Sequence, residues 1–180
     1  KKAQDAINNA KSNTDVDQAV DNGKLAINKD IANAAIDNAV AGKLKEVQDP
    51  LTTEEKQAYT DLINDAAVNA KQKIADATTS EAVTKAQEEG IKNINDIHVP
   101  TTSPAKDAAN AAIDQALKKK EDEINSATNI SSEEKQALIN QATEAANTAK
   151  SNINNATTNA AIETAQVNGC LLYTSDAADD

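Results

Sequence analysis

The sequence predicts an all-α protein made of tandem antiparallel three-helix bundles that form an elongated rod. Three observations predict this: a repeated helix-forming stretch, apolar residues at helical spacing, and a lack of bulky side chains. The stretch LTTEEKQAYTDLINDAAVNAKQKIADATT covers residues 51–79, and its echo ISSEEKQALINQATEAANTAKSNINNATT covers residues 130–158. The two copies align without a gap, so the chain contains an internal repeat.

Each copy of the stretch carries the signals of one long helix. Thr52 with Glu55, and Ser131 with Glu134, have the spacing of a capping box. Behind each cap, apolar residues recur every three or four positions and draw one stripe along a helix. The stripe contains Tyr59, Ile63, Ala66, Ala70, Ile74 and Ala77 in the first copy, and Leu138, Ala142, Ala145, Ala149, Ile153 and Ala156 in the second. Such a narrow stripe needs partner helices, which the flanking segments must supply.

The composition favours several slim bundles over one thick core. The 180 residues include no Phe, Trp or Met, and only 4 Gly and 3 Pro. The net charge of −11 argues against a nucleic-acid partner, whose phosphates would repel the chain. No apolar run reaches the roughly 18–20 residues of a membrane span.

Further helices complete each repeat. AAIDNAV at 34–40 matches AAIDQAL at 111–117, and each begins a first helix, expected over Ala32–Gln48 and Ser103–Asn125. Asp49-Pro50 stops the former, and Ser103-Pro104 starts the latter. The predicted organisation is the C-terminal part of a truncated repeat at 1–30, a complete three-helix repeat at 31–98, a linker at 99–102, a second, truncated three-helix repeat at 103–169, and a non-native tail at 170–180.

The two junctions between repeats differ in sequence. No Pro or loop cluster separates the first repeat from the truncated one, which predicts a continuous helix from about Thr14 to Gln48. HVPTTSP at 98–104 separates the two later repeats and predicts a short extended linker.

A glycine follows the stretch at the same place in every copy, at Gly23, Gly90 and Gly169. It falls on the apolar stripe of the next helix. It either lets a neighbouring helix approach bare backbone or ends its helix as a C-cap. Packing is favoured, because the stripe continues beyond the glycine.

The order of these motifs resembles the tandem "domain of unknown function 1542" repeat. The resemblance is carried by Leu51–Lys56, Ala70–Thr79, Gly90–Ile94 and Ala111–Asp114, and it covers essentially all of residues 1–169. That repeat occurs in large wall-anchored surface proteins of Gram-positive bacteria. The resemblance implies an all-helical stalk or adhesin region linked to attachment and biofilm, located extracellularly and anchored to the cell wall. It supplies no catalytic residues. The missing linker after Gly23 departs from the family pattern.

The last residues break the repeat. Cys170–Asp180, CLLYTSDAADD, contains the single cysteine and resembles the translation of a sequencing-library adaptor. It is therefore interpreted as a non-native tail. Without it the chain has no cysteine, which excludes disulfides and thiol chemistry from the repeats.

Four features look like sites, and each has a simpler interpretation. Asp15, Asp17 and Asp21 resemble part of a calcium loop, but Ala19 stands where an oxygen ligand is needed, so a solvated helix face is favoured. His98 has no second histidine with which to build a metal site and is read as a linker residue.

The other two are a charge run and an aromatic residue. Lys118–Lys120 are followed by Glu121–Glu123, and on a helix these charges pair at three and four residues. Tyr59 is read as core filler near a helix start. No nucleophile–base pair or phosphate loop is present, so the sequence offers no catalytic, cofactor-binding or metal residues, and we expect no enzyme and no cofactor.

The favoured function is a non-catalytic structural spacer in a bacterial surface adhesin, with neighbouring repeats of the same chain as partners. The alternative is a binding module in which one bundle face holds a host matrix or serum protein. That alternative would require an exposed apolar or aromatic cluster in both repeats, and the sequence shows none.

Overall fold

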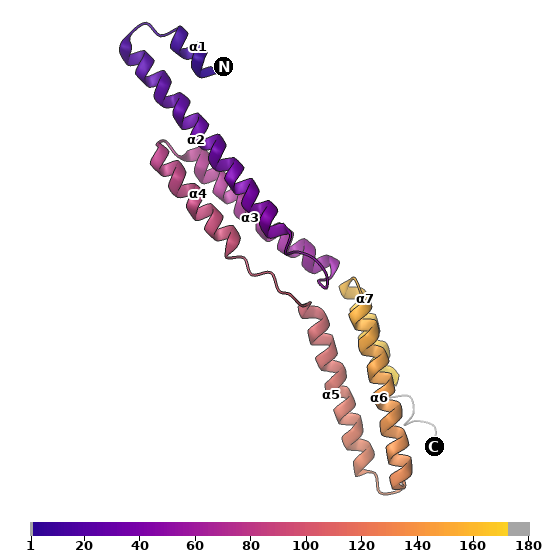
Figure 1. The fold of residues 1–180 in the computed structure, drawn as a ribbon. Coiled ribbons are helices and arrows are strands. Elements are labelled where there is room, and N and C mark those ends of the chain that lie inside the picture. Colours follow the sequence, from indigo (N-terminus) through magenta and orange to yellow (C-terminus); the bar gives the residue numbers. More distant parts are fainter. Residues whose placement is uncertain (1, 173–180) are drawn as a thin grey trace. The chain divides into compact units, whose positions relative to one another are not determined.

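A computed structural model describes residues 2–172 of the chain, and the side-chain surroundings of residues 2–169. The described residues form helices joined by turns and a non-helical segment, with no strand among them, which confirms the all-α prediction. The helices are α1 (Lys2–Asn8), α2 (Asn13–Leu44), α3 (Thr53–Asp76), α4 (Ser80–Asn95), α5 (Pro104–Ser126), α6 (Ser132–Asn155) and α7 (Asn159–Leu172). Figure 1 traces them along the chain.

The chain divides into two compact units. Among the described residues, unit 1 contains residues 2–47 and 58–99, and unit 2 contains residues 48–57 and 100–172. The start of α3 therefore packs in unit 2, and the rest of that helix packs in unit 1.

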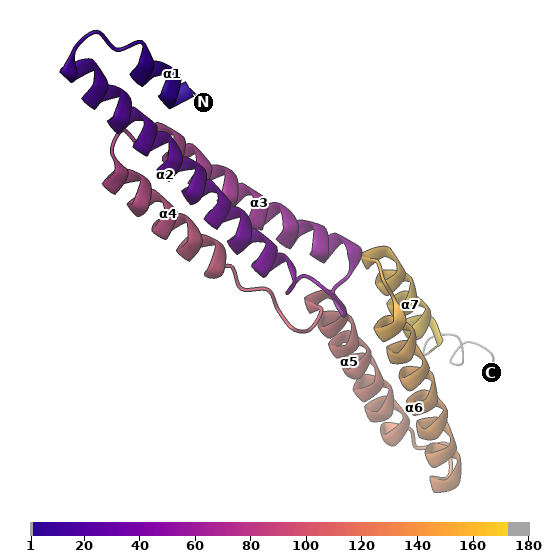
Figure 2. The same ribbon diagram turned by 45° about the horizontal axis from the view of Figure 1, so that its top comes forward.

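Unit 1 is a bundle in which α2, α3 and α4 lie side by side (Figure 1 and Figure 2). Helices α2 and α3 are antiparallel: Lys29 Nζ lies 2.6 Å from the carbonyl oxygen of Ala75, while Asp37 lies 2.5 Å from the ammonium of Lys71. The core combines residues from all three helices, namely Ala32, Ile36, Ile63, Ala67, Ala70, Ile74, Val83, Ala86 and Ile94. It contains only aliphatic side chains, as the composition requires.

The first half of α2 packs against α1. Ile27 stands four residues after Gly23, as Ile94 stands four residues after Gly90. Ile94 is fully buried, whereas Ile27 is 59% exposed. The same sequence position is thus covered in one repeat and uncovered in the other.

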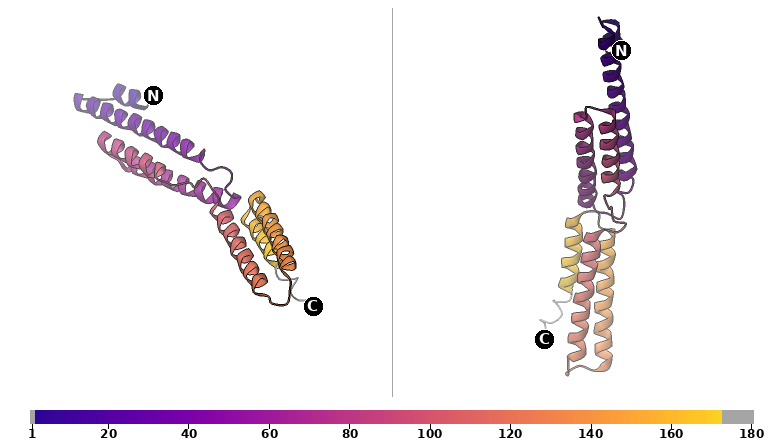
Figure 3. Two further views of the ribbon diagram at one scale, coloured as in Figure 1. Left: turned by 60° about the horizontal axis from the view of Figure 1, so that its bottom comes forward. Right: turned by 90° about the vertical axis from the view of Figure 1, so that its left-hand side faces the viewer.

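Unit 2 repeats this design with α5, α6 and α7 (Figure 3). Asp114 pairs with Lys150, and Asn110 Nδ2 donates to Asn154 Oδ1, so α5 and α6 are antiparallel. The core contains Ala109, Ile113, Ala142, Ala146, Ala149, Ile153, Ala156, Ile162 and Ala165. Most buried positions of α3 and α6 lie on the predicted stripes. At one turn of each helix the prediction was off by one residue: Ala67 and Ala146 are buried, whereas the predicted Ala66 and Ala145 are only partly buried and pack against the cores.

The glycine on each stripe is a packing residue. Gly90 lies inside α4, and none of the described glycines has a positive φ. A Cβ on Gly90 would lie 2.5 Å from the Cβ of Ala70 and 2.7 Å from the Cδ1 of Ile36. At Gly169 the equivalent distances are 2.6 Å to Ala149 and 2.9 Å to Ile113. The prediction that glycine admits a close helix neighbour is confirmed.

The two predicted junctions are also present. Helix α2 runs without interruption through the first junction, although it ends at Leu44 rather than at Gln48. Residues 45–47 close it with turn hydrogen bonds before Asp49-Pro50. A segment without helix joins α4 to α5, and Ser103 caps α5 with Pro104 in its first turn. Helix α7 continues past Gly169 to Leu172, and residues 173–180 of the interpreted tail lie outside the described residues.

Candidate functional site: the capping corner of α3

The most elaborate polar cluster in the described residues surrounds the start of α3. We call residues 51–55 the Thr52 corner. The Thr52 backbone N–H donates to Glu55 Oε2 at 2.9 Å, and the Glu55 backbone N–H donates to Thr52 Oγ1 at 3.2 Å. This reciprocal pair is the predicted capping box.

The second oxygen of Glu55 reaches another helix. The Ala105 backbone N–H, in the first turn of α5, donates to Glu55 Oε1 at 2.9 Å. Ser103 caps the same turn by accepting from the Lys106 backbone N–H at 3.2 Å. One carboxylate therefore serves the N-terminal ends of two helices, where backbone N–H groups lack helical partners and favour negative charge.

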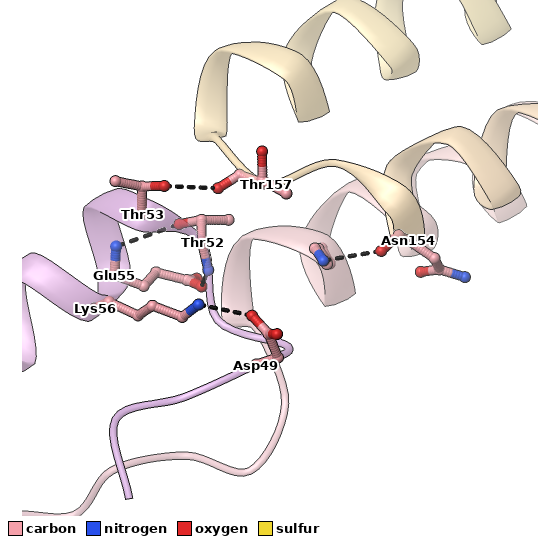
Figure 4. Close-up of polar contacts among 8 residues, drawn as sticks. Asp49, Thr52, Thr53, Glu55, Lys56, Asn154 and Thr157 are labelled. Atoms are coloured by element: carbon pink, nitrogen blue, oxygen red, sulfur yellow. Dashed lines mark hydrogen bonds and ion pairs between the residues drawn. The ribbon is translucent and has the colours of Figure 1, made fainter. Parts of the chain in front are cut away.

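The Thr52 corner also contacts the turn before α7. The Thr53 backbone N–H donates to the Thr157 carbonyl oxygen at 2.8 Å, and the Thr53 hydroxyl donates to the same oxygen at 3.1 Å. Thr52 Oγ1 donates to Asn159 Oδ1 at 2.8 Å, and the Asn159 backbone N–H donates to Glu54 Oε2 at 3.0 Å. Figure 4 shows Thr53 facing Thr157 across this contact.

The centre of this cluster is buried, whereas Thr53, Thr157 and Asn159 at its edge are exposed. Thr52 is fully buried, Ser103 is 1% exposed, and Leu51 is 3% exposed. A buried hydroxyl is costly unless it is hydrogen-bonded, so these bonds make the burial possible.

The environment shifts the titration of Glu55. Partial burial raises the pKa of its carboxyl, but hydrogen bonds from the backbone N–H groups of Thr52 and Ala105 and from the hydroxyl of Ser103 outweigh burial. Together they hold the pKa of Glu55 below its ordinary value of 4.5.

Two lysines lie beside the Thr52 corner. Lys106, 9% exposed, donates from Nζ to the carbonyl oxygen of Asn154 at 2.9 Å and so caps the end of α6. Lys56 pairs with Asp49 at 2.6 Å, and its hydrogen bond and charge hold the pKa of the Asp49 carboxyl below the ordinary 3.8. Both lysines line a hollow of 310 Å³. Lys29 makes the same cap on Ala75 in unit 1, so the role of Lys106 is structural.

The second repeat contains the same capping box in a different setting. We call residues 130–134 the Ser131 corner. The Ser131 backbone N–H donates to Glu134 Oε2 at 2.7 Å, and the Glu134 backbone N–H donates to Ser131 Oγ at 3.2 Å. Ser131 and Glu134 are exposed. Within the described part of the chain, the Ser132 backbone N–H has no acceptor, whereas its counterpart Thr53 donates to Thr157.

The residues singled out in the sequence lie apart from this cluster. Asp15, Asp17 and Asp21 are exposed on α2, and His98 is exposed in the segment before α5. No group of three potential metal ligands occurs among residues 2–172. Tyr59 is half-buried on α3.

The charge run on α5 pairs as expected. Lys118 lies 3.3 Å from Asp122, and Lys119 lies 4.0 Å from Glu123, all on exposed side chains. None of the helices in the described range is long and apolar enough to cross a membrane.

The two units define a class of protein: an all-helical tandem repeat whose copies share one core and one capping pattern. Residues 28–102 and 105–170 each match the family model described as Domain of Unknown Function (DUF1542). The chain therefore belongs to the DUF1542 family. Neither a curated protein nor a solved structure matches it.

Proposed function

We propose that this chain is a non-catalytic spacer segment of a bacterial surface adhesin, in which serial helical repeats hold a distal region away from the cell wall. On this proposal the chain is extracellular and wall-anchored and serves attachment and biofilm formation. Family membership supports the tandem-repeat part of the proposal, and the surface location rests on the resemblance described above.

One observation carries the proposal: both repeats build the same core from the same positions. Gly90 faces Ala70 and Ile36 in unit 1, and Gly169 faces Ala149 and Ile113 in unit 2. A repeat that is stable through local contacts can be multiplied without redesign, and this is the property that a spacer of adjustable length requires.

Structural roles account for the polar clusters. Glu55 caps α3 and contacts α5, and Lys106 caps α6. The pKa of Glu55 is lowered, which keeps it ionised, whereas acid–base catalysis near neutrality needs a carboxyl with a raised pKa.

Small-angle X-ray scattering of the full chain tests the proposal. A compact globule of this length would have a radius of gyration of roughly 16 Å, and we expect a value well above it. A lengthened chain, residues 1–169 followed by residues 91–169, gives a second test of the particle's length. It adds one repeat in register, because Gly169 stands in the place of Gly90 and residue 91 follows it. With helices of 24 residues, each added repeat should extend the longest dimension by roughly 35 Å.

Two results would overturn the proposal. One is a compact particle whose longest dimension does not grow when a repeat is added. The other is saturable binding of a host matrix or serum protein to the unmodified chain, which would make the binding module the better account.

A further inference from the structure

We propose that the Ser131 corner is a docking surface for the N-terminal face of another repeat, one that opens with a Ser-Pro-Ala-Lys turn after a non-helical linker. This inference rests on the proposed spacer function and names the partner of one surface within it. The partner face is defined by the two segments that the Thr52 corner contacts, residues 103–106 and 157–159.

The two corners are chemically equivalent. Thr52, Thr53, Glu54 and Glu55 correspond to Ser131, Ser132, Glu133 and Glu134. Each hydroxyl is replaced by a hydroxyl and each carboxylate by a carboxylate. The Ser131 corner therefore offers every donor and acceptor that the Thr52 corner uses, and its capping box is already formed.

The Ser131 corner also has a backbone donor without an acceptor among the described residues. Thr53 donates its backbone N–H to Thr157 at 2.8 Å, whereas Ser132 has no acceptor within the described residues. The repeat-equivalent contact shows which acceptor fits this N–H: the carbonyl oxygen of a Thr-Thr-Asn turn at the start of a third helix.

A repeat that opens with a continuous helix, as unit 1 does, does not fit this corner. Ala105 can donate to Glu55 because it lies in the first turn of α5, where its N–H lacks a helical acceptor. The equivalent residue in unit 1, Asn28, lies in the middle of α2, and its side chain donates to Ser80 Oγ at 2.9 Å. Ser80 stands where Asn159 stands in unit 2. In an uninterrupted helix, the backbone N–H of Asn28 is not available to a glutamate in the way that the Ala105 N–H is available to Glu55. The Ser80 hydroxyl, which takes the place of the Asn159 side-chain oxygen, already accepts a hydrogen bond from Asn28.

Two lengthened chains compare a repeat that opens after a non-helical linker with a repeat that opens as a continuous helix. The linker chain is residues 1–169 followed by residues 91–169, which brings a second 98–106 segment and a second Thr-Thr-Asn turn. The matched control, the continuous chain, is residues 1–169 followed by residues 24–99, which joins the added repeat through an uninterrupted helix. In the linker chain, the terminal copies of Ser131 and Ser132 are changed to Thr, so that their peptides differ in mass from the internal ones.

Hydrogen exchange resolved to single amides is the readout. Because a backbone hydrogen bond that is broken only by local opening slows exchange, we expect the internal Ser132 amide to exchange at least about tenfold more slowly in the linker chain than in the unmodified chain. In the continuous chain its rate should be unchanged. The Thr53 amide within the first 169 residues should stay slow in all three chains and reports that unit 2 is folded. In the continuous chain the added copies of Thr52 and Thr53 are changed to Ser, so that their peptides differ in mass.

Changing the internal copy of Glu134 to Ala in the linker chain (Glu134→Ala) should return the internal Ser132 amide to the fast exchange rate that it has in the unmodified chain. Equal Ser132 rates in the linker and continuous chains would overturn the docking inference. If the linker chain nevertheless scatters as a longer particle, the spacer function stands and only the docking fails. If Ser132 is protected but the particle stays compact, the spacer function fails and the docking stands.

Discussion

The Thr52 corner and the Ser131 corner are the same local structure in two environments. Each is a capping box made by a hydroxyl residue and a glutamate three positions later, with hydrogen bonds of 2.7–3.2 Å. Thr52 is fully buried, whereas Ser131 is exposed. In the Thr52 corner, Glu55 and Thr53 make further bonds to Ala105 and Thr157.

A cap and a docking contact are therefore separate functions of one motif. Starting the helix needs only residues within one turn, so both corners form it. Docking needs a second face with free N–H and carbonyl groups, and only the Thr52 corner has one in this structure.

The largest difference between the corners should come from removing the glutamate. Glu55→Ala deletes the cap and the bond to Ala105, so we expect it to lower the free energy of unfolding by about 2–4 kcal/mol. Glu134→Ala deletes only a cap and should cost about 1 kcal/mol. Urea denaturation of both variants checks this. Equal costs would mean that the bond to Ala105 adds no stability.

The cores of the two units should respond alike, in contrast to the corners. Gly90→Ala and Gly169→Ala each force a methyl group into a neighbouring helix, and each should cost about 1–3 kcal/mol. Gly42→Ala is the control, because nothing lies within 4 Å of its added Cβ, and it should gain up to about 1 kcal/mol. Thermal unfolding of the three variants is the measurement, and a neutral Gly90→Ala would contradict the close packing of α3 and α4.

The pH dependence should separate Glu55 from an ordinary carboxylate. Its pKa in the folded state lies below 4.5, so its contribution to stability is present above pH 4.5 and is lost as the pH falls through the folded pKa. Unfolding measured between about pH 5 and 2.5 should therefore show a smaller loss of stability in Glu55→Gln than in the unmodified chain. Parallel curves for the two proteins would indicate that the Glu55 carboxylate has the same pKa folded and unfolded.

The smallest effects should come from the exposed ion pairs that the repeats share. Asp37 pairs with Lys71, and Asp114 pairs with Lys150 at the equivalent place. Because the carboxylates are more than half exposed, Asp37→Asn and Asp114→Asn should each cost less than about 1 kcal/mol. Chemical denaturation in low and in high salt should show that both costs shrink as the salt rises. A large cost for one variant alone would mean that the repeats are less equivalent than their cores suggest.

Much of the fold could be predicted because its signals are local. The capping boxes, the stripe from Ile63 to Ile74 and the continuous helix through Gly23 all depend on residues within a few turns of one another. The sequence predicts the end of α2 too late, at Gln48. Asp49-Pro50 limits how far the helix can extend, but it does not determine the residue at which the helix ends. The turn at 45–47 ends the helix first.

The candidate site could not be predicted, because its partners are distant in sequence. Thr52 and Asn159 are 107 positions apart, and Glu55 and Ala105 are 50 apart. The residue types give no signal either, since the Ser131 corner has the same chemistry and no such contacts. Only the arrangement of the helices reveals which corner is buried.

The exchange rates of two backbone amides in the unmodified chain test the central claim most directly. The Thr53 amide donates to Thr157 at 2.8 Å, and the Ser132 amide has no acceptor in the described residues. Both begin a long helix behind the same kind of cap, so their local structure is matched. We expect the Thr53 amide to exchange at least about tenfold more slowly than the Ser132 amide, after correction for intrinsic rates. Equal corrected rates would contradict the claim that one corner is docked and the other is free.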